Sequence, residues 1–268
     1  MTAIKSMIKA IVGYEQRQLI RALIHMPRNI LALLENYSYD FFRFMRASSS
    51  LELAHNKTQL LAWIDADAHK LEKGLSLSAP RAGFGKGVAE RLVREILTFK
   101  DKFGSHDSLE TAIDVLAQYV DFNQKHEVVY EALFHDIEAL HKLRSHYKSL
   151  GGCDEYTKAQ WLEQSQFDLE SFVKSRRSIR HFADKPVDLS LIEKAVSMAM
   201  HTPTVCNRQA VKAHAYLEPA SIQKVLACQQ GNSGFGNQAK AALVVTVDRE
   251  SFFTAAERNQ CWIDGGLF

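Results

Sequence analysis

Arginine and hydroxyl side chains gather in one short segment in the last third of the chain. Residues 175–180 read Ser-Arg-Arg-Ser-Ile-Arg and lie where a helical pattern gives way to an extended run. Arginine offers forked donors to a doubly charged phosphate, and serine and backbone N–H groups can satisfy its remaining oxygens. This spacing predicts a site for a phosphate monoester. Taken alone, the segment is explained more simply as a cationic helix end that the helix dipole stabilises.

A polar turn follows at 202–209, with the pattern Pro-Thr-x-x-Asn-x-Gln just before a predicted strand. Its amides and hydroxyl can form hydrogen bonds with the edge of a flat heterocycle. Between the two segments lie the helix entry Pro186-Val187-Asp188 and a helix of about four turns. These features in this order are much more specific than either segment alone, and they weigh against the simple helix-end explanation.

Together these features resemble the start of the FMN-binding domain of nitroreductase-like oxidoreductases, over residues 175–217 and more weakly through Phe268. The resemblance implies an α+β fold: a helical N-terminal region at 1–165, followed at 166–268 by a truncated nitroreductase-like, FMN-binding, mixed-sheet domain. It also implies FMN as cofactor, NAD(P)H as electron donor, an unknown organic acceptor, and a homodimer in which both subunits build each flavin site. No catalytic side chain is expected, because the cofactor carries the redox chemistry.

The resemblance implies a role for each matching position. Arg176 and Ser178 would hold the FMN phosphate and ribityl chain, and Arg177 would lie beside them and contribute through its backbone. Arg180 would stabilise the anionic reduced flavin near its N1–O2 edge. The other positions expected to contact the flavin are Pro203, Thr204, Asn207, Gln209 and Asn232. For residues 230–232, an ordinary glycine-rich loop is an equally good explanation. The sequence departs from the family pattern at Ala210-Val211, where many relatives have proline and an aromatic residue, and this departure leaves the shape of the substrate open.

The composition is that of a soluble globular protein, since 46% of the 268 residues are hydrophobic and 24% are charged. A net charge of +2 argues against a nucleic-acid-binding protein. The cysteines are widely separated, the histidines lack metal-ligand spacing, and no run of about 20 apolar residues is present. These patterns predict a cytoplasmic protein with no metal site, no disulfide framework and no integral membrane segment.

The first 165 residues have the three-to-four spacing of helices almost throughout. One apolar stripe begins at Ile4 and continues to Ile24, Pro27 is expected to stop or kink that helix, and a second stripe begins at Ile30. A loop and N-cap are expected at 48–50. Further stripes predict helices at 53–71, 88–97, 109–123 and 128–150, before the glycines at 151–152 break the pattern.

The sharpest motif of the helical region is His-Lys-Leu-Glu-Lys-Gly-Leu at 69–75, followed by the glycine-rich loop at 80–87. It resembles an N-terminal extension found in a subset of nitroreductase-like proteins from polysaccharide-synthesis settings. His69, Glu72 and Lys73 share one helix face, and the glycines permit close backbone approach. We favour a salt-bridged helix end with a glycine C-cap and a packed loop over a ligand or catalytic site.

After residue 152 the pattern predicts a short helix that ends at the arginines, a helix capped by Asp188 or Ser190, and a helix beginning at Pro219. Strands are predicted at 212–217 and 241–247, the second of them buried. Two strands alone rarely form a stable sheet, and the apolar run 262–268 resembles the start of a further element. We therefore expect a C-terminally incomplete form of a longer protein, with weak or absent FMN binding.

A second class of function fits the same sequence. More than half of the chain is helical extension, and the residues that complete the flavin site in relatives are not found before Phe268. In this alternative the protein is a non-catalytic binding or assembly protein, associated with polysaccharide synthesis, and its flavin domain is vestigial. Flavin content and NAD(P)H consumption distinguish this alternative from the enzyme.

Overall fold

A computed structural model describes residues 13–49, 56–142, 144 and 151–268 of the chain. Its contacts divide the chain into two units, with the division between Ser48 and Ser49. Several predicted positions, namely Ile4, Ile8, Ile11, Val12, Leu53 and residues 145–150, lie outside the described residues. The predicted boundary between 1–165 and 166–268 stays a prediction.

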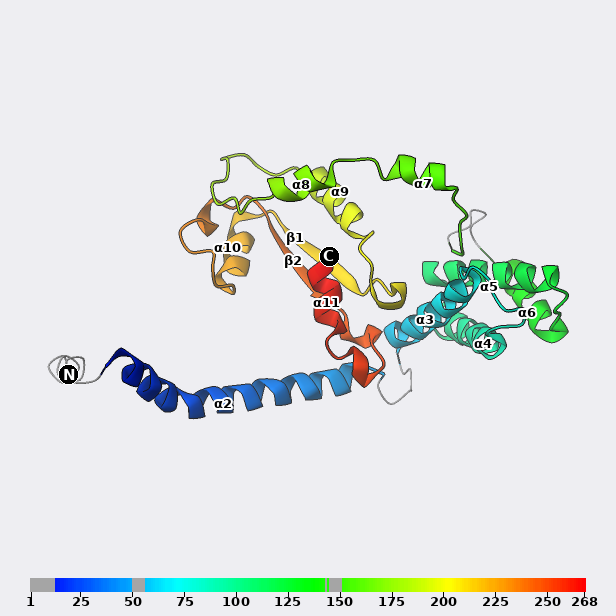
Figure 1. Cartoon of the computed structure of the whole chain (residues 1–268), viewed down its shortest axis with the longest axis horizontal. Helices are drawn as coiled ribbons and strands as arrows, with labels where there is room; N and C mark the ends of the chain where they lie inside the picture. The colour runs from blue at the N-terminus through cyan, green and yellow to red at the C-terminus, as the bar shows by residue number, and fades with distance from the viewer. Residues whose placement is uncertain (1–12, 50–55, 143, 145–150) are drawn as a thin grey trace. The chain divides into compact units, whose positions relative to one another are not determined.

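The first unit contains one long helix, α2 (Tyr14–Ala47), which includes Pro27 in its interior (Figure 1). Of the two predicted effects of Pro27, a stop or a kink, the stop is therefore wrong, and the stripes on either side of Pro27 belong to one element. Proline removes only one backbone hydrogen bond and crowds one carbonyl, and long helical turns on both sides continue past that defect. The helix ends where the N–H of Ser48 donates to the carbonyl of Phe44 at 2.9 Å.

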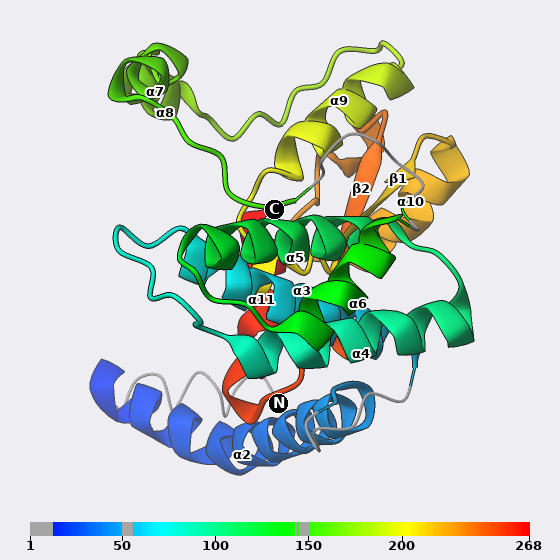
Figure 2. The same ribbon diagram turned by 90° about the vertical axis from the view of Figure 1, so that its right-hand side faces the viewer.

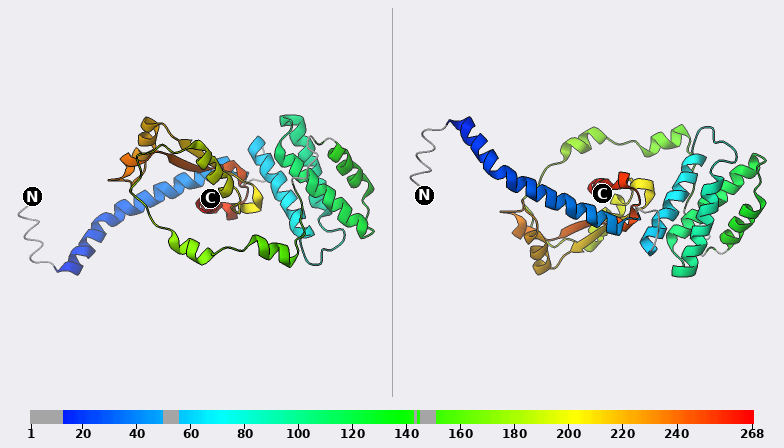
Figure 3. Two further views of the ribbon diagram at one scale, coloured as in Figure 1. Left: turned by 90° about the horizontal axis from the view of Figure 1, so that it is seen from above. Right: turned by 90° about the horizontal axis from the view of Figure 1, so that it is seen from below.

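The second unit begins with a group of four helices, α3 (Lys57–Leu75), α4 (Lys86–Phe103), α5 (Asp107–Lys125) and α6 (Glu131–Lys142). Helix α3 packs on α4 and α5, and α6 packs on α5 and α4, so that the four share one core (Figure 2). Both views of Figure 3 show the same grouping. The largest fully buried side chains of this core are Ile64, Leu71, Leu92, Ile96, Phe99, Ile113, Leu116, Tyr119, Ile137 and Leu140.

The start of α3 differs from the prediction. Asn56 caps the helix by accepting the N–H of Gln59 at 2.9 Å, in place of a serine at 48–50. An asparagine side chain satisfies an unpaired donor of the first turn as well as serine does, so composition alone does not choose between them. The predicted helix at 109–123 is confirmed as α5, and the glycines at 151–152 lie outside helix and strand as predicted.

The end of α3 shows why a glycine stands at position 74. The helix continues through Gly74 and is capped by Ser76, so the predicted glycine C-cap is wrong. The predicted close approach is confirmed, because a Cβ atom on Gly74 would lie 2.0 Å from Cε2 of Phe84. That ring belongs to the glycine-rich loop, whose backbone is held by two contacts: Tyr119 Oη donates to the Phe84 carbonyl at 2.7 Å, and the N–H of Gly83 donates to Asn123 Oδ1 at 2.8 Å.

The face of α3 toward α4 has a buried carboxylate with cationic partners. Asp67 has a fully buried side chain that accepts from Arg91 Nε at 2.5 Å and from Lys70 Nζ at 2.8 Å. Glu95, one turn beyond Arg91, has a buried Oε2 with no hydrogen-bond partner among the described residues. Burial, and then the charge of Asp67, raise the pKa of Glu95 to about 7, although Arg91 and neighbouring cations oppose this change.

This shift predicts a stability that depends on pH. Between the ordinary pKa of 4.5 and about 7, the folded protein holds a proton on Glu95 that the unfolded chain releases, so stability falls as the pH rises through this window. We expect Glu95→Gln to raise the free energy of unfolding by about 1–3 kcal/mol at about pH 8, and to change it little at about pH 4. Urea unfolding at both pH values measures this effect. Glu90→Gln, a more exposed carboxylate of the same helix, is the control, and an equal gain for both variants would contradict the prediction.

The remainder of the second unit is a mixed α and β region. Its helices are α7 (Lys158–Gln164), α8 (Leu169–Ser175), α9 (Leu189–Ala199), α10 (Pro219–Ala227) and α11 (Gln260–Leu267). Strands β1 (Val211–Tyr216) and β2 (Ala242–Val247) pair antiparallel, with Val211 opposite Val247. Short 3₁₀ turns lie at η1 (Val205–Asn207), η2 (Gly236–Gln238), η3 (Arg249–Ser251) and η4 (Ala255–Glu257).

Most of these elements lie where the sequence predicts them. Asp188 caps α9 by accepting the N–H of Ser190, which settles the choice between the two predicted caps, and Pro219 opens α10. The prediction of a buried second strand is wrong, because Leu243 and Val245 are 48% and 43% exposed. Successive side chains of a strand point to opposite faces, and α10 and α11 pack on β2 without covering both of these faces.

Candidate functional site

The predicted phosphate-binding segment is an exposed stretch of chain. Helix α8 ends at Ser175, and residues 176–188 contain no helix or strand. Arg177 is turned back on its own backbone, since its Nη1 donates to the carbonyls of Lys174 and, at 2.8 Å, Arg176. Within the described ranges, the side chains of Arg176 and Ser178 make no hydrogen bond or ion pair. The segment therefore presents a guanidinium and a hydroxyl whose donors are unused.

Arg180 lies beside the loop that contains Asn232. Its guanidinium carbon is 6.0 Å from the centroid of the Phe235 ring, and the N–H of Phe182 donates to Gln238 Oε1 at 3.4 Å. The side-chain amide of Asn232 donates to the carbonyl of Leu226 at 2.6 Å and so closes the end of α10. The structure thus brings two of the predicted site segments together, and it gives Asn232 a structural role.

The polar turn at 203–209 has a defined and unusual backbone. Cys206, Asn207 and Gln209 have positive φ angles of 49°, 52° and 49°, which residues other than glycine rarely adopt. Thr204 Oγ1 accepts the N–H of Gln209 at 3.2 Å, and Gln209 Nε2 donates to Asn207 Oδ1 at 2.8 Å. Three of the predicted flavin-contacting residues are therefore neighbours in one turn, next to the exposed Pro203.

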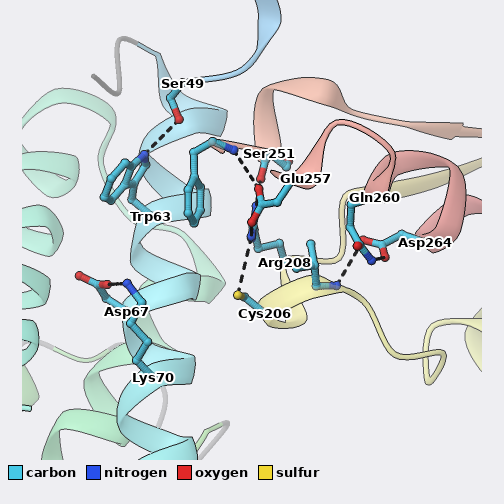
Figure 4. A network of polar contacts seen from close by, with 12 residues as sticks. Ser49, Trp63, Asp67, Lys70, Cys206, Arg208, Ser251, Glu257, Gln260 and Asp264 are labelled. Atoms are coloured by element: carbon cyan, nitrogen blue, oxygen red, sulfur yellow. Dashed lines mark hydrogen bonds and ion pairs between the residues drawn. The ribbon is translucent and has the colours of Figure 1, made fainter. Parts of the chain in front are cut away.

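A residue that the site prediction omits holds this turn in place. Arg208 has a side chain that is 1% exposed, and it bonds both carboxylate oxygens of Glu257, at 2.6 Å and 3.1 Å (Figure 4). Its Nη1 also donates to the carbonyl of Ser251 at 2.5 Å. The guanidinium lies 4.2 Å from the centroid of Phe253, which itself stacks on Trp63 of α3 at 4.9 Å. Arg208 therefore links the turn to η3, to η4 and to the helical group.

The electrostatics of this pair agree with its geometry. Burial alone would raise the pKa of Glu257, but the hydrogen bonds from Arg208 and from the N–H of Phe253 hold it below its usual value. The carboxylate of Asp264 on α11 fixes the other side of the turn, since it accepts the N–H of Val205 at 3.3 Å and Gln260 Nε2 at 2.8 Å. No local sequence pattern predicts the pairing of Arg208 with Glu257, because the two residues are far apart along the chain.

The two predicted halves of the flavin site are separate in this structure. Among the described residues, no hydrogen bond, ion pair or ring contact joins Arg176, Arg177 or Ser178 to the turn at 203–209. The turn contacts α3 of the helical group, and the arginine segment continues into the residues that contact Phe235 and Gln238. Each half is assembled locally on its own elements.

The described part of the chain contains neither a candidate membrane span nor a candidate metal centre. None of its helices is both long enough and apolar enough to cross a membrane. No group of three or more His, Cys, Asp or Glu side chains in those residues is arranged to hold a metal ion.

The fold and the site define an α+β protein in which a helical region precedes a domain built on a short antiparallel sheet. Residues 173–265 match the model of the nitroreductase family. The C-terminal part of the chain is therefore a nitroreductase-like domain, which confirms the resemblance and the fold class and supports an oxidoreductase in general. No solved structure matches the chain. The match does not favour the non-catalytic alternative.

Proposed function

We propose that the protein is an FMN-dependent oxidoreductase that passes electrons from NAD(P)H to an organic acceptor. The observation that carries this proposal is the pair of unused donors on Arg176 and Ser178, inside the domain that matches the nitroreductase family. An exposed guanidinium beside an exposed hydroxyl at a spacing of two residues suits the oxygens of a phosphate monoester. FMN ends in such a group.

The hydrogen-bond donors of these segments suit both the phosphate and the ring of FMN. Arg176 and Ser178 would hold the phosphate, with backbone N–H groups near Arg177. Arg180 adds a positive charge beside Phe235, where it would favour an anionic form of the flavin ring. The amides of Asn207 and Gln209 would meet a heterocycle edge in the turn. FMN supplies the hydride and electron chemistry, and the protein supplies binding, orientation and charge.

The separation of the two halves supports assembly as a homodimer. A flavin that is held by the arginine segment of one subunit would meet the turn at 203–209 of a second subunit, so that neither subunit forms the site by itself. Ala210 and Val211, both buried at the start of β1, leave the acceptor's shape undefined. We place the protein in the cytoplasm on the strength of its widely spaced cysteines.

Flavin content tests the proposal. We expect the purified full-length protein to release FMN on denaturation, and Arg176→Ala in that protein to weaken FMN binding about tenfold or more, because a charge-assisted contact to the phosphate is lost. Fluorescence titration with FMN measures the change. Arg94→Ala, an exposed arginine of α4, is the matched control and should bind as the unmodified protein does. Undiminished binding by Arg176→Ala would show that the phosphate lies elsewhere.

The same measurements distinguish the proposed enzyme from the alternative, a non-catalytic binding or assembly protein. Bound flavin together with NAD(P)H consumption identifies an enzyme. A folded full-length protein that binds no FMN and consumes no NAD(P)H would instead favour a binding or assembly protein with a vestigial flavin domain.

A further inference from the structure

A cavity of about 340 Å³ lies where the helical group meets the nitroreductase-like domain. We call it the junction pocket, and its charged and imidazole-bearing lining residues are Lys57, Asp65, His106, Arg208, Lys212 and Asp248. Cavities of about 300–1,000 Å³ are the usual size for small-molecule sites. The pocket is separate from the exposed arginine segment, and it shares Arg208 and Gln209 with the turn at 203–209.

Two helix N-termini converge on the junction pocket. Lys57 and Thr58 begin α3, and His106 and Ser108 lie at the cap and second position of α5. Each of these helices has 19 residues and brings the positive end of its dipole, although Asn56 Oδ1 already accepts the N–H of Gln59 at 2.9 Å and His106 Nδ1 accepts that of Ser108 at 3.2 Å. Two positive helix ends at one cavity favour a negatively charged group inside it.

A buried donor at the pocket also lacks a partner. Arg208 has a side chain that is 1% exposed, and its Nη atoms are satisfied by Glu257 and Ser251. Its Nε is buried and has no hydrogen-bond partner in the part of the chain that the structure describes. Unsatisfied buried donors are uncommon and call for an explanation. An acceptor atom on a ligand in the junction pocket supplies one.

The charges of the lining residues limit the ligand's own charge. Arg208 is balanced by Glu257, and Lys212 lies 3.9 Å from the carboxylate of Asp248. Lys57 has no ion pair among the described residues, and it is the cation left over below about pH 7, where Asp65 is protonated. One uncompensated positive charge suits one negative charge on the ligand, while Leu61, Ala62 and Ala210 offer an apolar wall. A phosphate dianion fits this balance poorly.

We propose that the junction pocket binds a small organic monocarboxylate with a short apolar body. The carboxylate lies toward the two helix N-termini and Lys57, and the apolar body lies against Leu61, Ala62 and Ala210. Lys57, Leu61, Ala62 and Ala210 are not assigned to FMN, so this proposal does not require the flavin site, although Gln209 lines the pocket and is also expected to contact flavin.

Asp65 makes the site sensitive to pH. Burial raises the pKa of Asp65 to about 7, against the opposing effects of the Arg208 charge and the Ser108 hydrogen bond. Below that pH the carboxyl is neutral and tolerates a carboxylate ligand, and above it two negative charges share the pocket. The other titratable groups that face it are Lys57 and Glu72 from α3, His106 from α5, and Arg208, Lys212 and Asp248 from the domain. Burial, and then the charge of Lys57, lower the pKa of His106, which favours its neutral form.

Calorimetric titration of the flavin-free protein with benzoate and hexanoate tests the proposal. We expect both probes to bind at millimolar concentration, benzamide to bind far more weakly, and the affinity for benzoate to fall about tenfold between about pH 6 and pH 8. Lys57→Gln should weaken benzoate about tenfold, and Lys125→Gln, at the opposite end of α5, should leave it unchanged. Asp65→Asn should abolish the pH dependence, whereas His106→Asn, which keeps a capping side chain, should retain it.

Three results would overturn the proposal. They are failure of both carboxylates to bind the folded protein, equal binding of benzoate and benzamide, and full affinity in Lys57→Gln. Circular dichroism of each variant confirms that it is folded. The flavin proposal stands or fails separately, because its test uses FMN and Arg176→Ala.

Discussion

Replacement of Arg208 by methionine is expected to lower the free energy of unfolding by about 3–5 kcal/mol, which is the usual cost of removing one partner of a buried ion pair. The change leaves Glu257, whose side chain is 15% exposed, without its bidentate partner, and it removes the donor to the Ser251 carbonyl. It also removes the cation from the face of Phe253. Urea unfolding at neutral pH measures the loss.

Two further variants separate the ion pair from its surroundings. Arg258→Met alters the exposed neighbour of Glu257 and should change stability little. Arg208→Met combined with Glu257→Gln should recover part of the loss, because no unpaired charge then remains. If Arg208→Met is no more destabilising than Arg258→Met, the network is not a determinant of stability.

The same pair predicts an acid dependence. The pKa of Glu257 is held below its ordinary value of 4.5, so its contribution is fully present above that pH and is lost as the pH falls through the lower folded-state pKa. The stability difference between the unmodified protein and Arg208→Met should therefore narrow in acid, below the ordinary pKa.

The second large effect is expected at Gly74. A Cβ atom there would lie 2.0 Å from the Phe84 ring, and that ring packs edge-on against Tyr119 at a centroid distance of 5.4 Å. The ring cannot move away without disturbing the core of the helical group. Gly74→Val should therefore lower the free energy of unfolding by about 1–3 kcal/mol or more, which is the usual cost of adding volume to a packed core. This loss is expected even though valine is a better helix former than glycine.

The control for this prediction is another helical glycine. Gly87 lies in the first turn of α4, and a Cβ atom there would meet nothing within 4 Å. Gly87→Ala should leave stability unchanged or raise it by up to about 1 kcal/mol. Thermal unfolding of the two variants is the comparison. Equal behaviour would contradict the steric explanation, and Gly74→Val with Phe84→Ala should lose less than the sum of the single changes.

Much of the fold can be predicted from local sequence signals, that is, residues that act on backbone only a few positions away. Caps identify α9 and α10, because an Asp188 side chain or a proline at position 219 acts on the backbone next to it. Alternation identifies β1, and a short apolar run identifies β2. The position of the arginine segment directly after α8 is likewise predictable from the local helical pattern before it. The match over 173–265 supports the family that these local motifs indicate.

The features that the sequence did not reveal depend either on a choice among similar local signals or on distant partners. Continuation of α2 through Pro27 depends on turns on both sides, and the N-cap at Asn56 was one of several polar residues near that boundary. The ion pair of Arg208 and Glu257, and the stacking of Trp63 on Phe253, join segments that no periodicity relates. The junction pocket is a product of those long-range contacts, so no motif could have predicted it.

The backbone of the turn at 203–209 has a consequence for how any ligand meets it. Cys206, Asn207 and Gln209 have positive φ angles. Each such backbone conformation costs about 1–3 kcal/mol, which contacts with the surroundings must offset. Here the offset comes from Asp264 on α11, which accepts the N–H of Val205, and from the buried Arg208. The positions of the side-chain amides of Asn207 and Gln209 therefore depend in part on α11. Any ligand that meets these amides is recognised through a turn whose conformation an element outside it helps to hold.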